Sequence, residues 1–288
     1  MRISARLAAS TFLSSGLIFG LASVTFAADL PPIDVGPGPV PAESLPAVSA
    51  FNGKIAGFGG WLDDETGDTG IGGLMGSFSV PLGHRFGFQA DAMVATAHSD
   101  FVGELGAHLF WRDPSKGLLG LYGEYVTRDD PDWETWRLGV EGHAYLGNIS
   151  LEALVGYEET DLPPGFSDDE NVFAYLDAAY YLNDNFRIAA GYRHLDGIHI
   201  GAAGLEYQFA ESFWGMGTSV FAEGRIGEDD YAAVWGGLRL YLGQENKPLI
   251  RRHREDDPGS FGDENLRDLL EDTPILCDPE ITFCGSAT

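Results

Sequence analysis

After residue 27, the sequence has no segment close to the roughly 18 consecutive apolar residues that a membrane-spanning helix needs. If the mature chain enters a membrane, it cannot do so through helices. A closed β-barrel then remains, because it leaves no backbone group unpaired in hydrocarbon. The sequence is also poor in positive charge, with 17 Lys and Arg against 44 Asp and Glu. We therefore expect no nucleic-acid partner, since phosphates are bound mainly by Lys and Arg.

Cysteine is scarce as well. Cys277 and Cys284 are the two cysteines of the chain, and both lie in its last twelve residues. In an oxidising periplasm they can form a small-loop disulfide, and the alternative is two free thiols in a loose tail. Two cysteines without histidines nearby make a poor zinc site. We expect no metal and no cofactor, because the barrel region also lacks a P-loop and metal-spaced histidines.

The N-terminal 27 residues have the features of a secretory signal peptide. Arg2 and Arg6 precede an apolar stretch over 12–24, and Thr25-Phe26-Ala27 provides a cleavage site. We expect the chain to be exported and this segment to be removed. Residues 28–50 contain six prolines and almost no periodicity, which predicts an extended periplasmic linker.

Residues 51–243 consist of segments in which apolar residues alternate with polar or small ones, separated by glycine, proline and acidic clusters. This is the pattern of transmembrane β-strands. It predicts an all-β fold, an antiparallel transmembrane β-barrel of about twelve strands, with ten or fourteen as alternatives. The expected strands are 51–62, 70–80, 86–96, 101–112, 118–128, 134–146, 149–159, 171–182, 186–195, 198–209, 218–227 and 231–242.

The connections between these segments alternate in kind. Residues 82–85, 114–117, 147–148 and 183–185 are short turns, whereas 63–68, 129–132, 161–170 and 228–230 are acidic loops. Short periplasmic turns and longer outer loops are typical of outer-membrane barrels. The alternation is imperfect, because the outer connections 97–100 and 196–197 are short and the turn 210–217 is long. An even number of strands places both termini in the periplasm and the barrel in the outer membrane.

Side chains of alternating parity should face lipid and lumen. In segment 118–128, Leu119 and Leu121 share one face, and Glu124 and Arg128 share the other. A basic residue facing the middle of the bilayer would cost about 2–4 kcal/mol, so the charged face should point inward. Aromatic residues near the segment ends suit the two membrane interfaces. A soluble β-sandwich with these rings in its core is the alternative fold. The aromatic residues are Phe86, Trp111, Tyr125, Trp136, Tyr157, Tyr192 and Phe209.

The residues predicted to face the lumen carry nearly balanced charge, with nine acids against eight bases. Strands three to eight supply most of the acids, and the last four strands supply four of the eight bases. One hypothesis is an acidic wall facing a basic wall across a water-filled pore. The other is a ladder of ion pairs that fills a narrow barrel, and twelve strands lie between filled and open barrels. The acidic wall is Asp91, Glu104, Glu124, Glu141, Glu152 and Asp177, and the basic wall is Arg187, Arg193, Arg225 and Arg239; Glu158, Glu206, Glu223, Lys54, Arg112, Arg128 and Arg137 complete the inward set.

The alternation stops near Gln244, and residues 244–288 form a polar periplasmic tail. Residues 263–272 are predicted to form a short helix, because Leu266, Leu269 and Leu270 share one helical face. The basic run 251–254 can contact periplasmic anionic groups or the inner leaflet.

The chain resembles porin-like outer-membrane β-barrel proteins of Gram-negative bacteria, particularly the alphaproteobacterial type. The resemblance lies in the leader end 25–32, the opening strand 51–57 and Gly191-Tyr192-Arg193. It implies an outer-membrane location and passive permeability. Together with the lumen charges, this predicts a small or nearly closed pore for small polar solutes or ions. The expected partners are outer-membrane lipid and the outer-membrane assembly machinery.

Two other functions remain open at this stage. The first is a non-conducting structural or adhesion barrel that displays acidic loops, above all 161–170. The second is a lipid-modifying enzyme, for which Ser150, His108 and His143 share the charged face of the strands. No compact nucleophile motif accompanies these residues, so we expect no catalytic residue and assign His108 and His143 to the luminal hydrogen-bond network.

Overall fold

The computed structural model describes residues 44–64, 67–97, 100–129, 132–161, 169–195, 197–228, 231–243 and 246–257. The predicted signal peptide, most of the linker, the helix expected at 263–272 and both cysteines lie outside these residues. No helix in the described part of the chain is long and apolar enough to cross a membrane.

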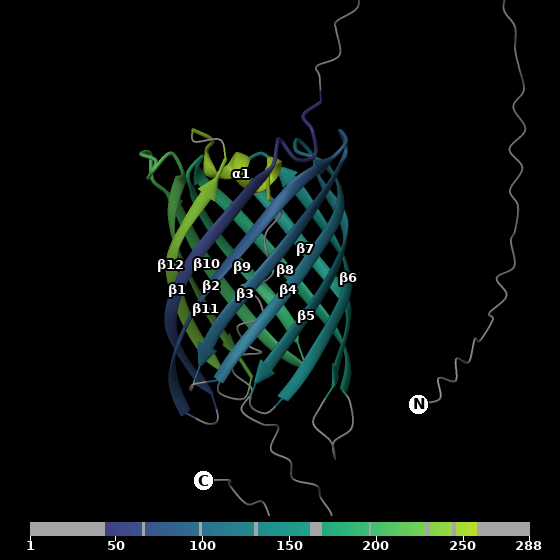
Figure 1. The fold of residues 1–288 in the computed structure, drawn as a ribbon, viewed down its shortest axis with the longest axis vertical. Coiled ribbons are helices and arrows are strands. Elements are labelled where there is room, and N and C mark those ends of the chain that lie inside the picture. The colour runs from purple at the N-terminus through teal and green to yellow at the C-terminus, as the bar shows by residue number, and fades with distance from the viewer. Residues whose placement is uncertain are drawn as a thin grey trace, which may run out of the picture. The chain divides into compact units, whose positions relative to one another are not determined.

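Twelve antiparallel strands form a closed barrel, which confirms the predicted fold class and the strand number of twelve (Figure 1). Each strand pairs with its neighbours in sequence, and β1 closes the barrel against β12. The strands are β1 (Asn52–Asp64), β2 (Gly67–Leu82), β3 (Phe86–Ala97), β4 (Asp100–Asp113), β5 (Gly117–Asp129), β6 (Asp132–Leu146), β7 (Ile149–Asp161), β8 (Asp169–Asn183), β9 (Phe186–Leu195), β10 (Ile198–Gln208), β11 (Gly217–Gly227) and β12 (Ala232–Leu242).

Closure between β1 and β12 depends on close backbone approach. Gly57 pairs with Leu238 and Phe58 pairs with Gly237 across this seam. A Cβ atom added at Gly237 would lie 2.0 Å from the carbonyl oxygen of Gly57, so no larger residue fits without a shift of the backbone. Glycine in this strand therefore serves strand packing.

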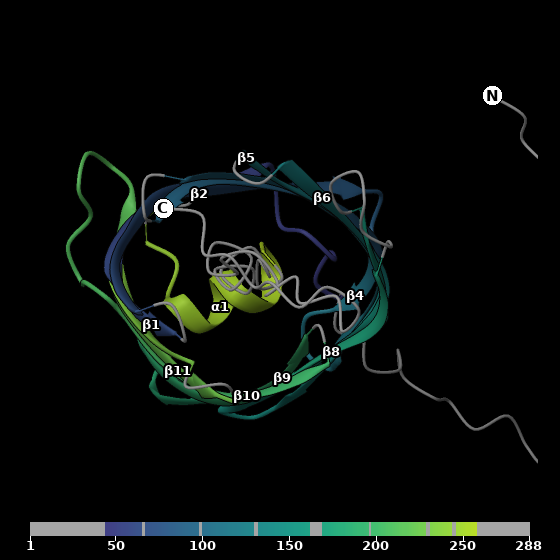
Figure 2. The same ribbon diagram turned by 90° about the horizontal axis from the view of Figure 1, so that it is seen from below.

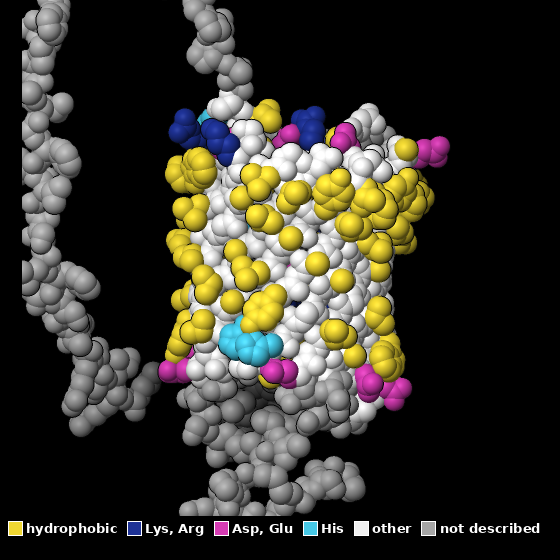
Figure 3. Space-filling view, turned by 180° about the vertical axis from the view of Figure 1, so that it is seen from behind, with side chains coloured by type: hydrophobic (Ala, Val, Ile, Leu, Met, Phe, Trp, Pro, Cys, Tyr) yellow, Lys and Arg dark blue, Asp and Glu magenta, His cyan; other side chains and the backbone are white. Residues whose placement is uncertain are grey.

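The outer surface of the barrel is apolar, because alternate side chains of every strand point away from the lumen. Leu119 and Leu121 are 65% and 59% exposed, and Leu138 is 71% exposed. On the face shown in Figure 3, hydrophobic side chains cover the wall, whereas Lys, Arg, Asp and Glu gather at its two ends. This distribution matches a surface that contacts hydrocarbon between two polar interfaces.

A short helix, α1 (Leu249–Glu255), follows β12 and lies across one end of the barrel (Figures 1 and 2). Viewed along the barrel, α1 falls inside the ring of strands (Figure 2). The first described residues, 44–51, lie at the same end, where β1 begins and β12 ends. Within the polar tail that begins at residue 244, the sequence pattern predicts a helix at 263–272 and none at 249–255, so α1 is a feature that the structure adds.

Candidate functional site

The inside of the barrel carries the charged side chains. All 17 residues predicted to face the lumen are buried or partly buried, while the large apolar side chains that are exposed on the same strands have the opposite parity. Glu152, Asp177, Arg187 and Glu223 are partly buried. The buried members are Asp91, Glu104, Glu124, Glu141, Glu158, Glu206, Lys54, Arg112, Arg128, Arg137, Arg193, Arg225 and Arg239.

One cluster in the lumen centres on His108 of β4. Its Nδ1 atom lies 3.0 Å from Glu141 Oε2, and its Nε2 atom lies 3.1 Å from Asp91 Oδ2. His143 Nε2 approaches the same Glu141 oxygen at 4.0 Å. The register of β3, β4 and β6 thus places one imidazole between two carboxylates, and its side chain has no exposed surface. Both ring nitrogens of His108 are directed at acids.

A second cluster centres on Arg137 of β6, which bridges its two neighbouring strands. Its Nη1 atom donates to Glu124 Oε2 on β5 at 3.0 Å, and its Nε atom donates to Glu158 Oε2 on β7 at 2.8 Å. Tyr122 Oη donates to the other Glu124 oxygen at 2.6 Å. The charged side chains of this cluster are at most 1% exposed. Hydrogen bonds to both carboxylates compensate for the loss of water around these charges.

A third cluster joins the wall to α1. Glu206 of β10 accepts hydrogen bonds from Arg239 Nη1 at 2.6 Å, from Tyr241 Oη at 2.8 Å and from Ser219 Oγ. His253 of α1 brings its Nε2 atom to 3.6 Å from the same carboxylate. One buried acid is therefore shared by strands β11 and β12 and by the helix that crosses the barrel end.

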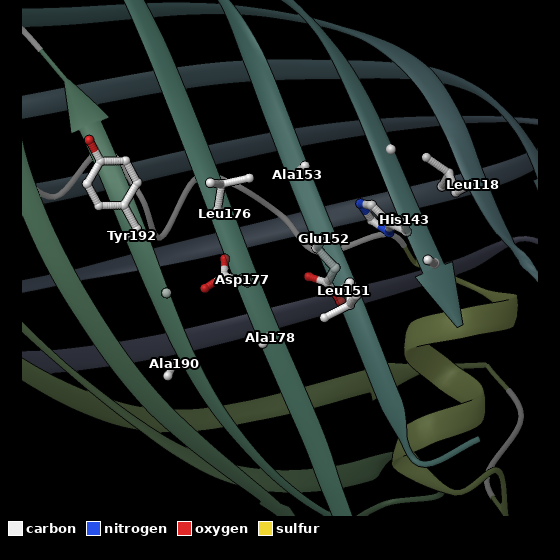
Figure 4. A pocket seen from close by; sticks show the side chains of 13 residues that line it. Leu118, His143, Leu151, Glu152, Ala153, Leu176, Asp177, Ala178, Ala190 and Tyr192 are labelled. Atoms are coloured by element: carbon white, nitrogen blue, oxygen red, sulfur yellow. The ribbon is translucent and has the colours of Figure 1, made fainter. Parts of the chain in front are cut away.

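Each residue of the predicted basic wall contacts an acid. Figure 4 shows Glu152 and Asp177, two of the partners, on the neighbouring strands β7 and β8, beside His143 on β6. Opposite charges therefore lie next to one another along the wall, which is the arrangement expected of an ion-pair ladder. The nitrogen–oxygen distances are 4.0 Å for Arg187 and Glu152, 2.8 Å for Arg193 and Asp177, 2.8 Å for Arg225 and Glu223, and 2.6 Å for Arg239 and Glu206.

Residues 246–257, here called the plug, close over this lumen from the end at which α1 lies. Arg254 Nη1 donates to the carbonyl oxygen of Gly147 at 2.8 Å, and its Nη2 atom donates to that of Ile149 at 2.9 Å. The guanidinium also stacks over the rings of Tyr145 and Tyr181, at 5.1 and 5.6 Å from their centroids. Arg254 thus fixes the plug to the turn between β6 and β7.

The C-terminal end of the plug binds the opposite part of the wall. Asp257 Oδ2 lies 2.8 Å from Lys54 Nζ on β1, and Ser79 Oγ on β2 donates to the backbone oxygen of Asp256 at 2.6 Å. Within the plug, Lys247 Nζ contacts the carboxylates of Asp256 and, at 3.0 Å, Glu255. The plug therefore contacts strands on both sides of the barrel mouth.

Electrostatic effects differ between the two faces of α1. Arg252 is buried, donates from Nε to Gln208 Oε1 at 2.9 Å, and has a lowered pKa because burial disfavours its charge. Burial alone would raise the pKa of Glu255, but hydrogen bonds from Arg251 and Lys247 lower it below its usual value. Arg251 itself is 53% exposed in its side chain, and its hydrogen bond to Glu255 raises its pKa.

The first described residues pack inside the same barrel mouth, where Val48 lies against the inward-facing Phe110 and Leu118, and they contact the plug. Ala47 N donates to the His84 carbonyl oxygen at 2.8 Å, and Arg112 Nε donates to the Ala47 carbonyl oxygen. Ser49 N donates to the backbone oxygen of Glu255 at 2.9 Å. This segment, which the sequence predicts to be linker, therefore joins the β2–β3 turn to the end of α1.

The residues considered for catalysis have other contacts. Ser150 Oγ accepts a hydrogen bond from Arg254 Nε at 3.2 Å, and His108 lies between its two carboxylates. Among the described residues, no group of three His, Cys, Asp or Glu side chains is placed to hold a metal ion.

Sequence reasoning missed that part of the lumen wall is apolar. An inward cluster on β1–β5 and β10–β12 includes Phe58, Leu62, Met93 and Trp235, each at most 8% exposed. Phe58 and Leu62 have the same strand parity as Lys54, so the inward parity of β1 could have identified them. The plug had no comparable signal, because its contacts are with residues distant in sequence.

Comparisons with known proteins agree with the fold. No protein-family model and no curated protein sequence matches the chain. Two solved structures of the KdgM porin, one in complex with disordered oligogalacturonate, each align with 65% of this chain and 98% of their own, at 12% identity and a TM-score of 0.50. The translocator domain of the autotransporter NalP from Neisseria meningitidis aligns with 68% of this chain and 89% of its own, at 13% identity and a TM-score of 0.44. An outer membrane channel from Pseudomonas putida F1 aligns with 72% of this chain and 99% of its own, at 12% identity and a TM-score of 0.45. At 12% identity, the likeness to the KdgM porin concerns the fold alone.

Proposed function

We propose that this chain is a porin-like protein of the Gram-negative outer membrane, of the alphaproteobacterial type that its leader and opening strand resemble. It forms a small, nearly closed pore for ions and small polar solutes. The observation that supports this best is the plug, which meets the lumen wall on both sides of one barrel mouth. An exposed apolar wall between two charged rims supports the membrane location.

The charge pattern of the lumen favours a narrow path. Ion pairs such as Arg193–Asp177 and Arg137–Glu158 draw side chains together along the wall and leave little net charge to attract ions of one sign. We therefore expect low conductance and weak selectivity between cations and anions while the plug is docked. A long acidic polymer such as oligogalacturonate, which is named with the KdgM porin, is not the expected solute for such a lumen.

The plug lies at the end where both described chain ends are found. With an even number of strands both chain ends share one side of the membrane, and in bacterial outer-membrane barrels we take this side to be the periplasm. The acidic connections are then at the outer surface. Release of the plug would open the lumen to the periplasm without breaking the wall, because the strand pairs close the barrel on their own.

Single-channel recording in planar lipid bilayers tests this proposal with three proteins. The mature protein should give small or rare current steps. A chain ending at Gly243, which lacks the plug, should give steps several times larger. A chain ending at Pro258, which keeps the plug and lacks the rest of the tail, is the matched control and should behave as the mature protein.

All three proteins must first show the heat-dependent gel shift of a folded barrel. Equal steps from the mature protein and the chain ending at Gly243 would contradict a closing role for the plug. Silence from both would reject the pore and favour the non-conducting barrel that displays acidic loops.

A further inference from the structure

The connection between β10 and β11 differs from the other described connections at the α1 end. Residues 209–216, here called the arm, separate these strands, whereas two or three residues separate the other strand pairs at this end. Phe213 N and Met216 O are 2.9 Å apart, and Met216 N and Phe213 O are 3.0 Å apart, so the arm ends in a small hairpin. Viewed along the barrel, a green loop at this position projects outside the ring of strands (Figure 2).

The tip of the arm holds an aromatic pair in a strained turn. Trp214 has a φ of 53° and Gly215 a φ of 75°, and a bulky residue in this region costs about 1–2 kcal/mol. The Trp214 side chain is nevertheless 82% exposed and lies 4.4 Å from the ring of Phe213, which is 52% exposed. The arm thus keeps a strained backbone conformation at a tryptophan whose side chain is not buried. Such strain is typical of functional sites, which indicates a binding role for the tip. Tryptophan is enriched where a membrane meets water.

A groove of about 790 Å³ lies between the arm and the outer wall. Its floor consists of outward-facing residues of β1, β11 and β12. Leu240 of β12 pairs with Ile55 of β1 and with Thr218 of β11, and Leu238 of β12 pairs with Gly57 of β1. Phe209 and Phe213 line it from the arm. The volume lies within the range of about 300–1,000 Å³ for small-molecule sites, and the lining is mainly apolar, as an acyl chain requires.

The polar part of the groove selects the headgroup. Glu211 and Ser212 of the arm line it, and Glu211 is exposed. None of the ten described residues that line the groove is Lys or Arg. A carboxylate at the periplasmic rim attracts a primary ammonium group, whereas an anionic headgroup without an amine meets only repulsion.

We propose that this groove binds one phosphatidylethanolamine molecule of the periplasmic leaflet. An acyl chain lies over Leu238, Leu240 and Ile55, and the ammonium group of the headgroup contacts Glu211. The proposal rests on the outer-membrane location given under the proposed function, and it does not depend on whether the barrel conducts. It adds a lipid site to the general expectation of contact with outer-membrane lipid.

Native mass spectrometry of the folded, full-length mature protein in detergent tests the site, with phosphatidylethanolamine or phosphatidylglycerol of identical acyl chains added. We expect one phosphatidylethanolamine to stay bound at concentrations at which phosphatidylglycerol does not. E211Q should reduce this preference about fivefold, the scale of one partly exposed ion pair. Equal retention of both lipids by the unmodified protein would overturn the assignment of the headgroup.

A second pair of variants tests the groove itself. G57L should fill the floor and abolish retention of both lipids, and it should fold, because a Cβ atom at Gly57 meets only a side-chain atom at 3.4 Å. The matched control is A178L, which fills a different hollow of the outer wall, between β6 and β9. Equal retention by G57L and A178L would place the lipid elsewhere and overturn the site. Current steps are recorded from the same preparations. They test the pore proposal, so a failure of the lipid site can be told apart from a failure of the pore.

Discussion

Replacing Arg137 with methionine tests whether water reaches the lumen at the cluster of Arg137, Glu124 and Glu158. The substitution leaves Glu124 and Glu158 without the guanidinium that donates to both. In a lumen closed to water, removal of one partner from a buried pair costs about 3–5 kcal/mol. In a water-filled pore, the same pair would be solvated and worth about 0–1 kcal/mol. The side chains of the pair are at most 1% exposed, so we expect the larger loss.

The assay is reversible urea unfolding of the barrel in lipid vesicles, followed by tryptophan fluorescence. L138A is the matched control, because Leu138 follows Arg137 on β6 and is 71% exposed on the outer wall. Its loss should be smaller than that of R137M. A triple variant, R137M with E124Q and E158Q, should recover part of the loss, because no uncompensated charge remains.

A loss below about 1 kcal/mol for R137M, the value of an exposed pair, would refute the reasoning. The pair would then be in contact with water, and the lumen would be an open pore at this level. Such a result would revive the hypothesis of two separated walls of charge.

Three further predictions concern the closure of the barrel and the docking of the plug. G237V should prevent closure, since its Cβ atom would meet the backbone of β1, and the folded band should disappear from gels, whereas G59A should fold normally. R254A should increase the current steps, because it removes the bonds to the β6–β7 turn, whereas K116A, which removes an exposed basic side chain from the β4–β5 turn, should leave them unchanged. Arg251 and Lys247, which lower the pKa of Glu255, belong to the plug itself, so the ionised carboxylate stabilises the folded conformation of the plug. This contribution is present above the ordinary pKa of about 4.3 and is lost as the pH falls below it. Current steps should therefore increase under acid conditions in the unmodified protein, and E255Q should show a weaker pH dependence.

The number of strands could be predicted because hydrocarbon imposes alternation on every strand. The strand ends could not be predicted as well, because backbone pairing does not require apolar side chains. Asp63 pairs with Asp68 and Asp64 with Gly67, so β1 and β2 continue beyond the last alternating residues. The inward faces were predictable for a similar reason, since a charge is costly on the lipid side.

The contacts within the lumen could not be predicted, because they depend on strand register. Arg193 meets Asp177 because β8 and β9 pair with Asp177 opposite Gly191, two residues from Arg193. A shift of register would have given the arginine another partner. The composition of the wall was therefore predictable, whereas its pattern of ion pairs was not.

The plug was hidden from sequence reasoning for a different reason. Its basic run suggests binding to anionic groups outside the barrel. In the structure, Arg254 instead donates to backbone carbonyl oxygens more than a hundred residues away in sequence. Carbonyl oxygens are present at every residue, so no pattern of residue types marks them as the acceptors.

Polar contacts narrow the barrel within the lumen and close it at one mouth, and these two sets of contacts are largely independent of each other. The clusters around His108 and Arg137 join strands to strands, so they persist whether the plug is docked or released. The plug meets the charged wall mainly through His253 at Glu206 and Asp257 at Lys54. Among the described plug residues, Leu249 is the only buried apolar side chain, so polar contacts hold most of the plug. Because water can replace such contacts at small net cost, the plug can leave its site while the barrel stays folded. Release would leave Lys54 and Glu206 facing the lumen as one base and one acid, so the opened pore should gain conductance and remain weakly selective.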